Sequence, residues 1–207
     1  MRIEVEDFKR QKLFEQYDNK TNPFLFVTTK VDITNIYNYC KLNRNFFATM
    51  GYFISLVVNE MDCFKYRKEN GKIYKYDTLK TNFTEMIDED NIGFFICDYV
   101  TSYKDFIENF KTKKENLLNS RVSTKNNDQG EVWLSCAPWY EFTSVISPFN
   151  KDTAIPQFIW SKYYEENEKM YINLTIMVHH GFADGNHIGL FLKKFNEKIN
   201  EINEYIK

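Results

Sequence analysis

The sequence is poor in the residues that build metal centres and disulfide frameworks. It has four cysteines in 207 residues, Cys40, Cys63, Cys97 and Cys136, and none of them forms a CxxC pair. Widely spaced thiols are typical of reduced cysteines that behave as small apolar side chains, rather than of a zinc site or a disulfide scaffold. We therefore expect neither a metal nor a disulfide.

Long apolar runs and an excess of charge are also lacking. No apolar stretch approaches the roughly 20 residues that span a bilayer. The first residues, MRIEVEDFKRQK, have no apolar segment of the kind found in signal peptides. Lys and Arg number 27 against 29 Asp and Glu, so the net charge of −2 gives no general attraction to nucleic acid or anionic membranes. The expectation is a cytoplasmic protein without a nucleic-acid or membrane partner.

Aromatic residues, by contrast, are abundant. They make up 17% of the chain, with 19 Phe and 14 Tyr, and all hydrophobic residues together make up 43%. This composition supplies a sizeable core and excludes a disordered chain. A single core stops growing only at roughly 250–300 residues, and the polar stretch 121–130 is too short to separate two domains. We expect one domain over residues 1–207.

The spacing of apolar residues predicts a mixed α/β domain. Helices are expected over residues 6–19, 44–60, about 102–118, and from Gly185 to Ile206. Strands are expected over residues 24–33, 81–87, 92–97, 131–136, 141–146, 156–164 and 170–178. The Asn70-Gly71 pair predicts a hairpin with a type I′ turn.

All three histidines fall within nine positions of the sequence. They are His179, His180 and His187, in the stretch LTIMVHHGFADGNHIG between a predicted strand and a predicted helix. The pKa of histidine, about 6.5, lies close to neutral pH, which suits a general base or a metal ligand. Alternation along the strand places His180 on the same face as the apolar residues and turns His179 to the other face.

The run from His179 to Gly185 has three interpretations. The first is a turn with Asp184 as the N-cap of the next helix. The second is a metal site made of His179, Asp184 and His187, which the absence of HExxH or His-x₃₋₅-His spacing disfavours. The third is a catalytic base at the end of a strand, with a nearby carboxylate that fixes the local geometry.

Two motifs resemble those of the chloramphenicol acetyltransferase family. HHxxxDG is the signature of this family, and it is shared more loosely by the acyltransferase cores of 2-oxo acid dehydrogenase complexes and by peptide-synthetase condensation domains. LSCAPWYEFTSV, residues 134–145, is similar to the family's SAxPW segment. Ser135 then falls on the serine that binds the oxyanion and Trp139 on the tryptophan that follows.

Two further segments extend this resemblance to nearly the whole chain. DFKRQKLFEQY, residues 7–17, is similar to the family's N-terminal helix, with Arg10 and Tyr17 at its arginine and aromatic positions. The strand, turn and strand of residues 156–178 lead into the histidines in the family's order.

The resemblance implies a two-layer α/β (α+β) sandwich, a mixed sheet covered by helices, assembled as a homotrimer with active sites between subunits. It implies an O-acetyltransferase that moves the acetyl group of acetyl-CoA to the primary hydroxyl of chloramphenicol in a ternary complex, without a metal. His180 would be the general base of one subunit, and Ser135 of the next subunit would donate to the oxyanion.

The remaining site residues are also implied by the resemblance. Asp184 would pair with Arg10 and hold the turn that aims His180, rather than act as the acid of a triad. Tyr17 would come from the same neighbouring subunit as Ser135. It would line the acceptor pocket together with Phe24, Leu25 and apolar residues of the segment 92–100.

The sequence differs from the family pattern at positions near the site. HHGFADGNH replaces HHAVCDGFH, so Gly181 and Asn186 change the packing and polarity of the turn. Ile159 stands where the family has a threonine that binds a water molecule. The acyl-transfer residues are therefore better supported than the identity of the acceptor.

Two alternatives follow from these differences. One is a related CoA-dependent acyltransferase with another hydroxyl acceptor. The other is a catalytically weak trimer of the same fold that binds an apolar ligand. Four residues favour an enzyme, because a protein that only binds has no need of all of them: His180, Ser135, Asp184 and Arg10.

Overall fold

The protein was analysed as a computed structural model, which describes residues 1–42, 45–125 and 128–206. The helical prediction for residue 44 and the loop prediction for residues 126–127 lie outside the described residues. In the described part of the chain, no helix is both long and apolar enough to cross a membrane.

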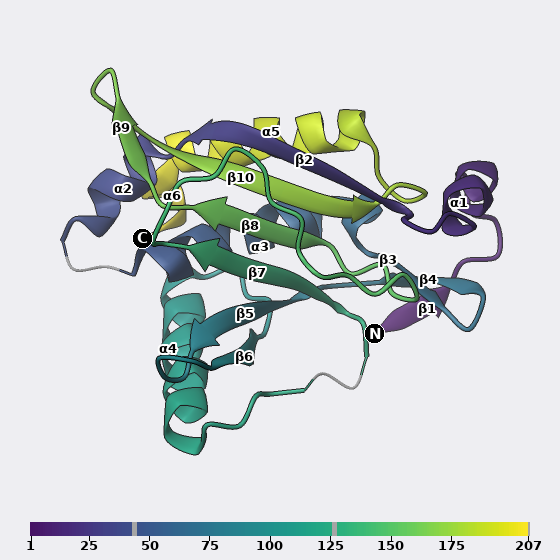
Figure 1. Cartoon of the computed structure of the whole chain (residues 1–207), viewed down its shortest axis with the longest axis horizontal. Coiled ribbons are helices and arrows are strands. Elements are labelled where there is room, and N and C mark those ends of the chain that lie inside the picture. The colour runs from purple at the N-terminus through teal and green to yellow at the C-terminus, as the bar shows by residue number, and fades with distance from the viewer. Residues whose placement is uncertain (43–44, 126–127, 207) are drawn as a thin grey trace.

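The chain contains both helices and strands, with two runs of four consecutive strands over residues 66–97 and 131–179, as a mixed α/β fold allows (Figure 1). The helices are α1 (Gln11–Asp18), α2 (Thr34–Cys40), α3 (Phe46–Glu60), α4 (Tyr103–Ser120), α5 (Gly185–Asn200) and α6 (Ile202–Tyr205), with a 3₁₀ turn at Asp62–Phe64. The strands are β1 (Arg2–Glu4), β2 (Phe24–Asp32), β3 (Tyr66–Glu69), β4 (Lys72–Tyr76), β5 (Lys80–Met86), β6 (Ile92–Cys97), β7 (Glu131–Ala137), β8 (Gln157–Ser161), β9 (Tyr164–Glu166) and β10 (Lys169–His179).

The main sheet has seven strands and is mixed. Its order is β2-β10-β8-β7-β5-β6, and β9 pairs with β10. The pairs β5–β7 and β7–β8 are parallel, and the other pairs are antiparallel. A smaller sheet, β1-β4-β3, lies beside α1 at one end of the molecule (Figure 1). The predicted fold class is confirmed.

Helices cover one face of the main sheet, and the sequence pattern explains why. Alternate residues of β10, from Ile172 to Val178, are buried in one core with the apolar residues of α3 and α5. Twelve consecutive residues of α3 are buried, so this helix is enclosed on all sides. A Cβ atom at Gly51 of α3 would lie 2.4 Å from Cζ of Phe83, so glycine allows the helix to approach the sheet closely.

The connection between β7 and β8 crosses the opposite face of the sheet. Asn173 Nδ2 donates to the carbonyl of Phe142 at 2.8 Å, and Gln157 Nε2 donates to the carbonyl of Pro148 at 3.2 Å. The strand predicted over residues 141–146 is therefore wrong. Because β7 and β8 are parallel neighbours, the chain needs a long crossover between them, and this segment supplies it.

The strand predicted over residues 156–164 is divided into β8 and β9, and the other predictions agree with the structure in type and differ at the ends of elements. Asn70 and Gly71 have φ values of 51° and 76°, as a type I′ turn requires. The short elements β1 and α2 were not predicted. The helix predicted from Gly185 to Ile206 is interrupted at Glu201, where φ is −99° and ψ is 26°, and so forms α5 and α6.

Candidate active site

The histidine-containing turn connects the end of β10 to the start of α5. The N–H groups of Phe182 and Ala183 donate to the carbonyl of His179 at 2.9 and 3.1 Å, which closes the turn. Asp184 is the N-cap of α5, and its carboxylate accepts from the N–H groups of Asn186 and His187 at 3.0 and 3.4 Å. The N-cap interpretation of Asp184 is thus confirmed.

Arg10 fixes this turn from the opposite side. Its Nη1 lies 2.8 Å from Asp184 Oδ2, and its Nε donates to the carbonyl of Gly181 at 3.2 Å. Burial raises the pKa of Asp184, but the hydrogen bonds from Arg10 and His187 outweigh burial and hold this pKa well below its usual range. The expected ion pair is present, and both carboxylate oxygens are occupied. These contacts are those of a carboxylate that fixes the turn, and they leave neither oxygen unoccupied for use as a base.

His180 lies directly after β10 with its ring held on two sides. The backbone N–H of His180 donates to the carbonyl of Pro23 at 2.9 Å, and the imidazole ring stacks on the ring of Tyr17 with centroids 4.0 Å apart. Nδ1 lies 3.3 Å from the carbonyl of Ala183. Because a carbonyl only accepts, this contact assigns the ring proton to Nδ1 and leaves the lone pair on Nε2. That tautomer is the one a general base needs.

His179 points away from His180 and is buried. Three aromatic rings surround it: Phe14, Phe24 and Phe182. Its Nδ1 accepts from the N–H of Gly181 at 3.2 Å, and its Nε2 lies 3.4 Å from Asp18 Oδ1, which Lys68 contacts at 2.7 Å. Burial lowers the pKa of His179 to about 4, so the ring is neutral at neutral pH. His179 thus anchors the backbone of the turn.

The metal interpretation finds no support in this arrangement. His179 is 2% exposed and enclosed by aromatic rings, whereas His187 contacts Asp184 at the start of α5. Within residues 1–42, 45–125 and 128–206, no three His, Cys, Asp or Glu side chains are placed to hold a metal ion.

The placement of Tyr17 corrects one expectation. The sequence resemblance assigned Tyr17 to the neighbouring subunit, beside Ser135. In the structure Tyr17 stacks on His180 of its own chain. The reason is the path of α1, which folds back over the turn while Arg10 just before it binds Asp184 and Phe14 packs on Phe182.

Ser135 lies in the middle of β7, on the face of the sheet that the helices leave free. It borders two cavities, one of about 260 Å³ and one of about 390 Å³. Ile159, its neighbour on β8, lines the smaller cavity, and Trp139 lines the larger one. Phe94 also lines the smaller cavity, in agreement with the expected contribution of the segment 92–100. A reacting group at Ser135 can be reached from both cavities.

Ser135 and His180 of one chain are too far apart to act together. Ser135 lies opposite Ile159, which lies opposite Thr175, so Ser135 is two strands away from β10. Two strand spacings amount to about 10 Å, and the residues from Thr175 to His180 add about 16 Å along the strand. The separation of roughly 19 Å exceeds the reach of one reacting group. A single chain therefore does not complete the predicted site.

The predicted pocket residues Phe24 and Leu25 belong to the interior of this chain. Phe24 is 8% exposed and packs on Phe149 and His179. Leu25 points to the opposite face and packs against the main core. Their assignment to an acceptor pocket stays a prediction, because their contacts within one chain are those of core residues.

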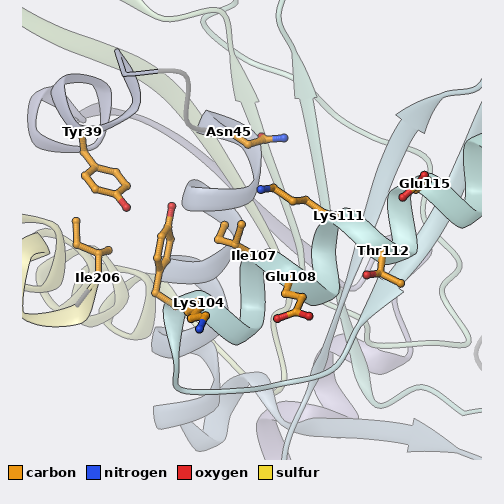
Figure 2. Close-up of a pocket in the computed structure, with 10 residues that line it drawn as sticks. Tyr39, Asn45, Lys104, Ile107, Glu108, Lys111, Thr112, Glu115 and Ile206 are labelled. Atoms are coloured by element: carbon orange, nitrogen blue, oxygen red, sulfur yellow. The ribbon is translucent and has the colours of Figure 1, made fainter.

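A larger groove, of about 1080 Å³, lies away from these residues. It runs between α2, α4 and the C-terminal end (Figure 2). Two lysines and two glutamates line it, Lys104, Lys111, Glu108 and Glu115, and Lys111 points toward Asn45. Since none of the predicted site residues borders this groove, we assign it no part in the chemistry.

Sequence reasoning missed several residues that shape the site. Asp18 and Lys68 lie behind His179. Asp18 directly follows Tyr17, the last residue of the segment that resembles the family's N-terminal helix, but nothing in the sequence indicates that Asp18 and Lys68 meet at His179. Trp133 lines the smaller cavity beside Ser135. It could have been found, because it precedes Ser135 by two residues on a predicted strand and so shares its face.

Known proteins resemble this chain over nearly its whole length. The family model of chloramphenicol acetyltransferase matches residues 1–196. The chain belongs to the chloramphenicol acetyltransferase family. The chloramphenicol acetyltransferase of Clostridium butyricum is 26% identical, over 99% of this chain and 97% of that protein. The enzyme of Campylobacter coli is also 26% identical, over 97% of this chain and 98% of that protein.

Solved structures show the same fold. A chloramphenicol acetyltransferase structure superposes with a TM-score of 0.83 at 22% identity, and the match covers 96% of this chain and all of that chain. A probable dihydrolipoamide acetyltransferase from Listeria monocytogenes superposes with a TM-score of 0.72 at 13% identity, over 97% and 95% of the two chains. The fold of the family is thus shared with lipoyl acyltransferases, as the loosely shared HHxxxDG motif suggests.

Proposed function

We propose that the protein transfers the acetyl group of acetyl-CoA to the primary hydroxyl of chloramphenicol, with His180 as the general base. The proposal rests on the contacts that orient the ring of His180. Its Nδ1 faces the carbonyl of Ala183, its ring is stacked on Tyr17, and its turn is fixed by the ion pair of Arg10 and Asp184. Nε2 is therefore oriented to accept a proton.

In this proposal the reaction has two steps. Nε2 of His180 takes the proton of the acceptor hydroxyl while its oxygen attacks the thioester carbonyl carbon. The hydroxyl of Ser135 donates to the oxygen that becomes negative, an interaction whose loss typically costs about 10²–10³ in rate. The tetrahedral intermediate then expels the thiolate of CoA, which receives the proton back from His180, and the acetyl ester is released.

We further propose that the two cavities at Ser135 divide the substrates. The larger cavity, between Cys136, Trp139 and Lys114, opens toward the exposed indole of Trp139 and suits the extended arm of acetyl-CoA. The smaller cavity suits the acceptor, because apolar and neutral side chains line it. Ser135 borders both, which is where the thioester carbonyl must lie.

A homotrimer completes the site in this proposal. The separation of Ser135 and His180 in one chain requires a second copy to supply His180. Large side chains are exposed near Ser135, with Trp139 64% and Ile146 66% exposed. An interface between two different surfaces forms a closed ring when its rotation closes and an open filament when it does not, and the family resemblance implies a closed ring of three. We retain a cytoplasmic location as part of the proposal.

One observation favours an alternative acceptor. Ile159 faces the same cavity as Ser135, where the family has a water-binding threonine, so the acceptor side departs from the pattern while the histidine turn does not. A related alcohol in place of chloramphenicol is therefore the second candidate, with the same acyl-transfer chemistry.

The test is release of CoA thiol in the presence of acetyl-CoA and chloramphenicol. The wild-type protein should release thiol in proportion to chloramphenicol, and His180→Ala should lose this activity while its melting temperature stays near that of the wild type. Lys193→Ala, on the exposed side of α5, is a matched control that should stay active. Thiol release that does not depend on chloramphenicol, or that survives in His180→Ala, would contradict the proposal.

A further inference from the structure

We infer that the indole of Trp133 determines which alcohol this enzyme accepts and limits it to a compact, uncharged primary alcohol. The inference rests on the acetyl transfer proposed above. Trp133 and Ser135 lie two residues apart on β7, so their side chains leave the sheet on the same face. Both border the cavity of about 260 Å³. An acceptor whose hydroxyl reaches Ser135 must place the rest of the molecule against Trp133.

The indole is a fixed wall. Its Nε1 donates to Oε1 of Glu131 at 2.7 Å, and Oε2 of the same carboxylate accepts from Asn82 Nδ2 at 3.2 Å. Glu131 is 5% exposed. The backbone N–H of Trp133 donates to the carbonyl of Pro156 at 3.0 Å. Because a charge-assisted hydrogen bond to a buried carboxylate holds the ring, an acceptor cannot displace the ring without breaking that bond.

A second part of the cavity wall is also held in place by hydrogen bonds. Ser147 and Pro148, from the crossover between β7 and β8, border the cavity, and both are bound by the side chain of Gln157. Gln157 is 6% exposed and lies beside Trp133 in the parallel pairing of β7 and β8. The volume between these walls is below the range of about 300–1,000 Å³ that is usual for ligand pockets. Bulk is therefore the property that this cavity selects against.

The lining of the cavity also selects against charge. None of the described residues around it is ionisable, and the carboxylate of Glu131 stands behind Trp133 and Asn82 rather than in the wall. A charged acceptor would lose its hydration without gaining a partner, which is costly. The acceptor class that remains is a small neutral alcohol.

The test compares acceptors of increasing size in the wild type and in variants with a smaller side chain at position 133. The acceptors are chloramphenicol, an analogue with a biphenyl in place of the nitrophenyl ring, and an analogue with a benzoyl in place of the dichloroacetyl group. In the wild type, kcat/KM should fall at least about tenfold for one of the enlarged analogues, since one methylene in an apolar pocket changes specificity about 10–200-fold. Trp133→Ala should remove most of this penalty, Trp133→Phe should remove part of it, and the KM for acetyl-CoA should stay unchanged in both.

Trp160→Phe is the matched control. Trp160 lies on the neighbouring strand β8, but it points to the opposite face and is 2% exposed. Its replacement should lower stability and preserve the size ranking of the acceptors. The inference is overturned if the wild type does not discriminate by size, if Trp133→Ala keeps the wild-type ranking, or if Trp160→Phe relaxes it equally.

Failure of the proposed function has a different signature. If the wild type acetylates none of the three alcohols, the acetyl transfer proposed above is wrong. Equilibrium dialysis of the same alcohols then tests the inference. A binding preference for the smaller compounds that Trp133→Ala relaxes supports it, and an equal preference in both proteins overturns it.

Discussion

Two adjacent histidines of this protein have opposite properties because of what touches each ring. His179 is enclosed by aromatic side chains and is neutral, whereas His180 is partly exposed and keeps one nitrogen available. The alternation of the strand predicted that they would differ in direction. It could not predict the burial of His179, since Asp18 and Phe14 reach that ring from a helix about 160 residues earlier in the sequence.

Stability should depend on pH through His179. Burial lowers its pKa from the ordinary 6.5 to about 4, so between these values the unfolded chain binds more protons than the folded chain. The free energy of unfolding should therefore fall as the pH is lowered through this window. In His179→Gln the free energy of unfolding should change less with pH than in the wild type. Thermal unfolding between pH 4 and 7 measures this dependence, and an equal dependence in both proteins would show that the ring is solvated.

Asp184→Asn should lower both stability and activity. Asparagine still caps α5, because it is as good an N-cap as aspartate, but the ion pair with Arg10 is lost. The partners are 22% and 31% exposed, so the cost should be about 1–3 kcal/mol, below the 3–5 kcal/mol typical of a fully buried pair.

The pH dependence of this difference has a definite sign. The pKa of Asp184 is depressed in the folded protein, so its contribution is present above the ordinary pKa of about 3.9 and is lost only as the pH falls through the folded value. The wild type and Asp184→Asn should thus differ in melting temperature at pH 7 and converge in strong acid. An inactive variant with a normal melting temperature would instead give Asp184 a direct role in the reaction.

At the scale of elements, position and type of the long helices and strands followed from periodicity. The strand predicted at residues 141–146 failed, although Phe142 and Val145 are partly buried, because local pattern does not reveal that β7 and β8 are parallel neighbours. The motifs named Arg10, Ser135, His180 and Asp184 as site residues, and of these the structure joins Arg10 to Asp184 in an ion pair. The contacts behind them depend on packing between distant elements and could not be read from any one segment.

The helix α1 packs closely on the histidine turn at Gly181, so a substitution of Gly181 tests this packing. A Cβ atom at Gly181 would lie 2.6 Å from the Cα of Phe14 and 3.2 Å from the ring of His179. Gly181→Ala should therefore shift α1, which carries Tyr17, and lower stability by about 1–3 kcal/mol. Acetyl transfer should fall with it.

Gly189→Ala is the matched control, because a Cβ atom there meets nothing within 4 Å. Alanine in the interior of α5 should raise stability by up to about 1 kcal/mol through its better helix propensity. The two substitutions should therefore shift the melting temperature in opposite directions. A Gly181→Ala variant as stable and active as the wild type would mean that α1 packs less tightly on the turn than described.

At the scale of the whole molecule, the separation of Ser135 and His180 means that the proposed reaction needs two chains to form one site. Each chain has the histidine turn at one place and the cavities around Ser135 at another, so in the proposed assembly these two parts contact different neighbouring chains. This arrangement predicts complementation between two inactive variants. Ser135→Ala chains still supply His180, and His180→Ala chains still supply Ser135.

Co-expression of the two variants, with separable tags, should therefore restore acetyl transfer in mixed assemblies. In the proposed ring of three, a trimer that contains both variants has one site in three that combines an intact His180 with an intact Ser135, so the purified mixed assemblies should reach about a third of the wild-type activity. Thiol release by tandem-purified mixed assemblies is the measurement, and each variant alone is the control. Activity no greater than the sum of the two controls would place both residues in a site within one chain, against the pairing of β7, β8 and β10 from which their separation follows.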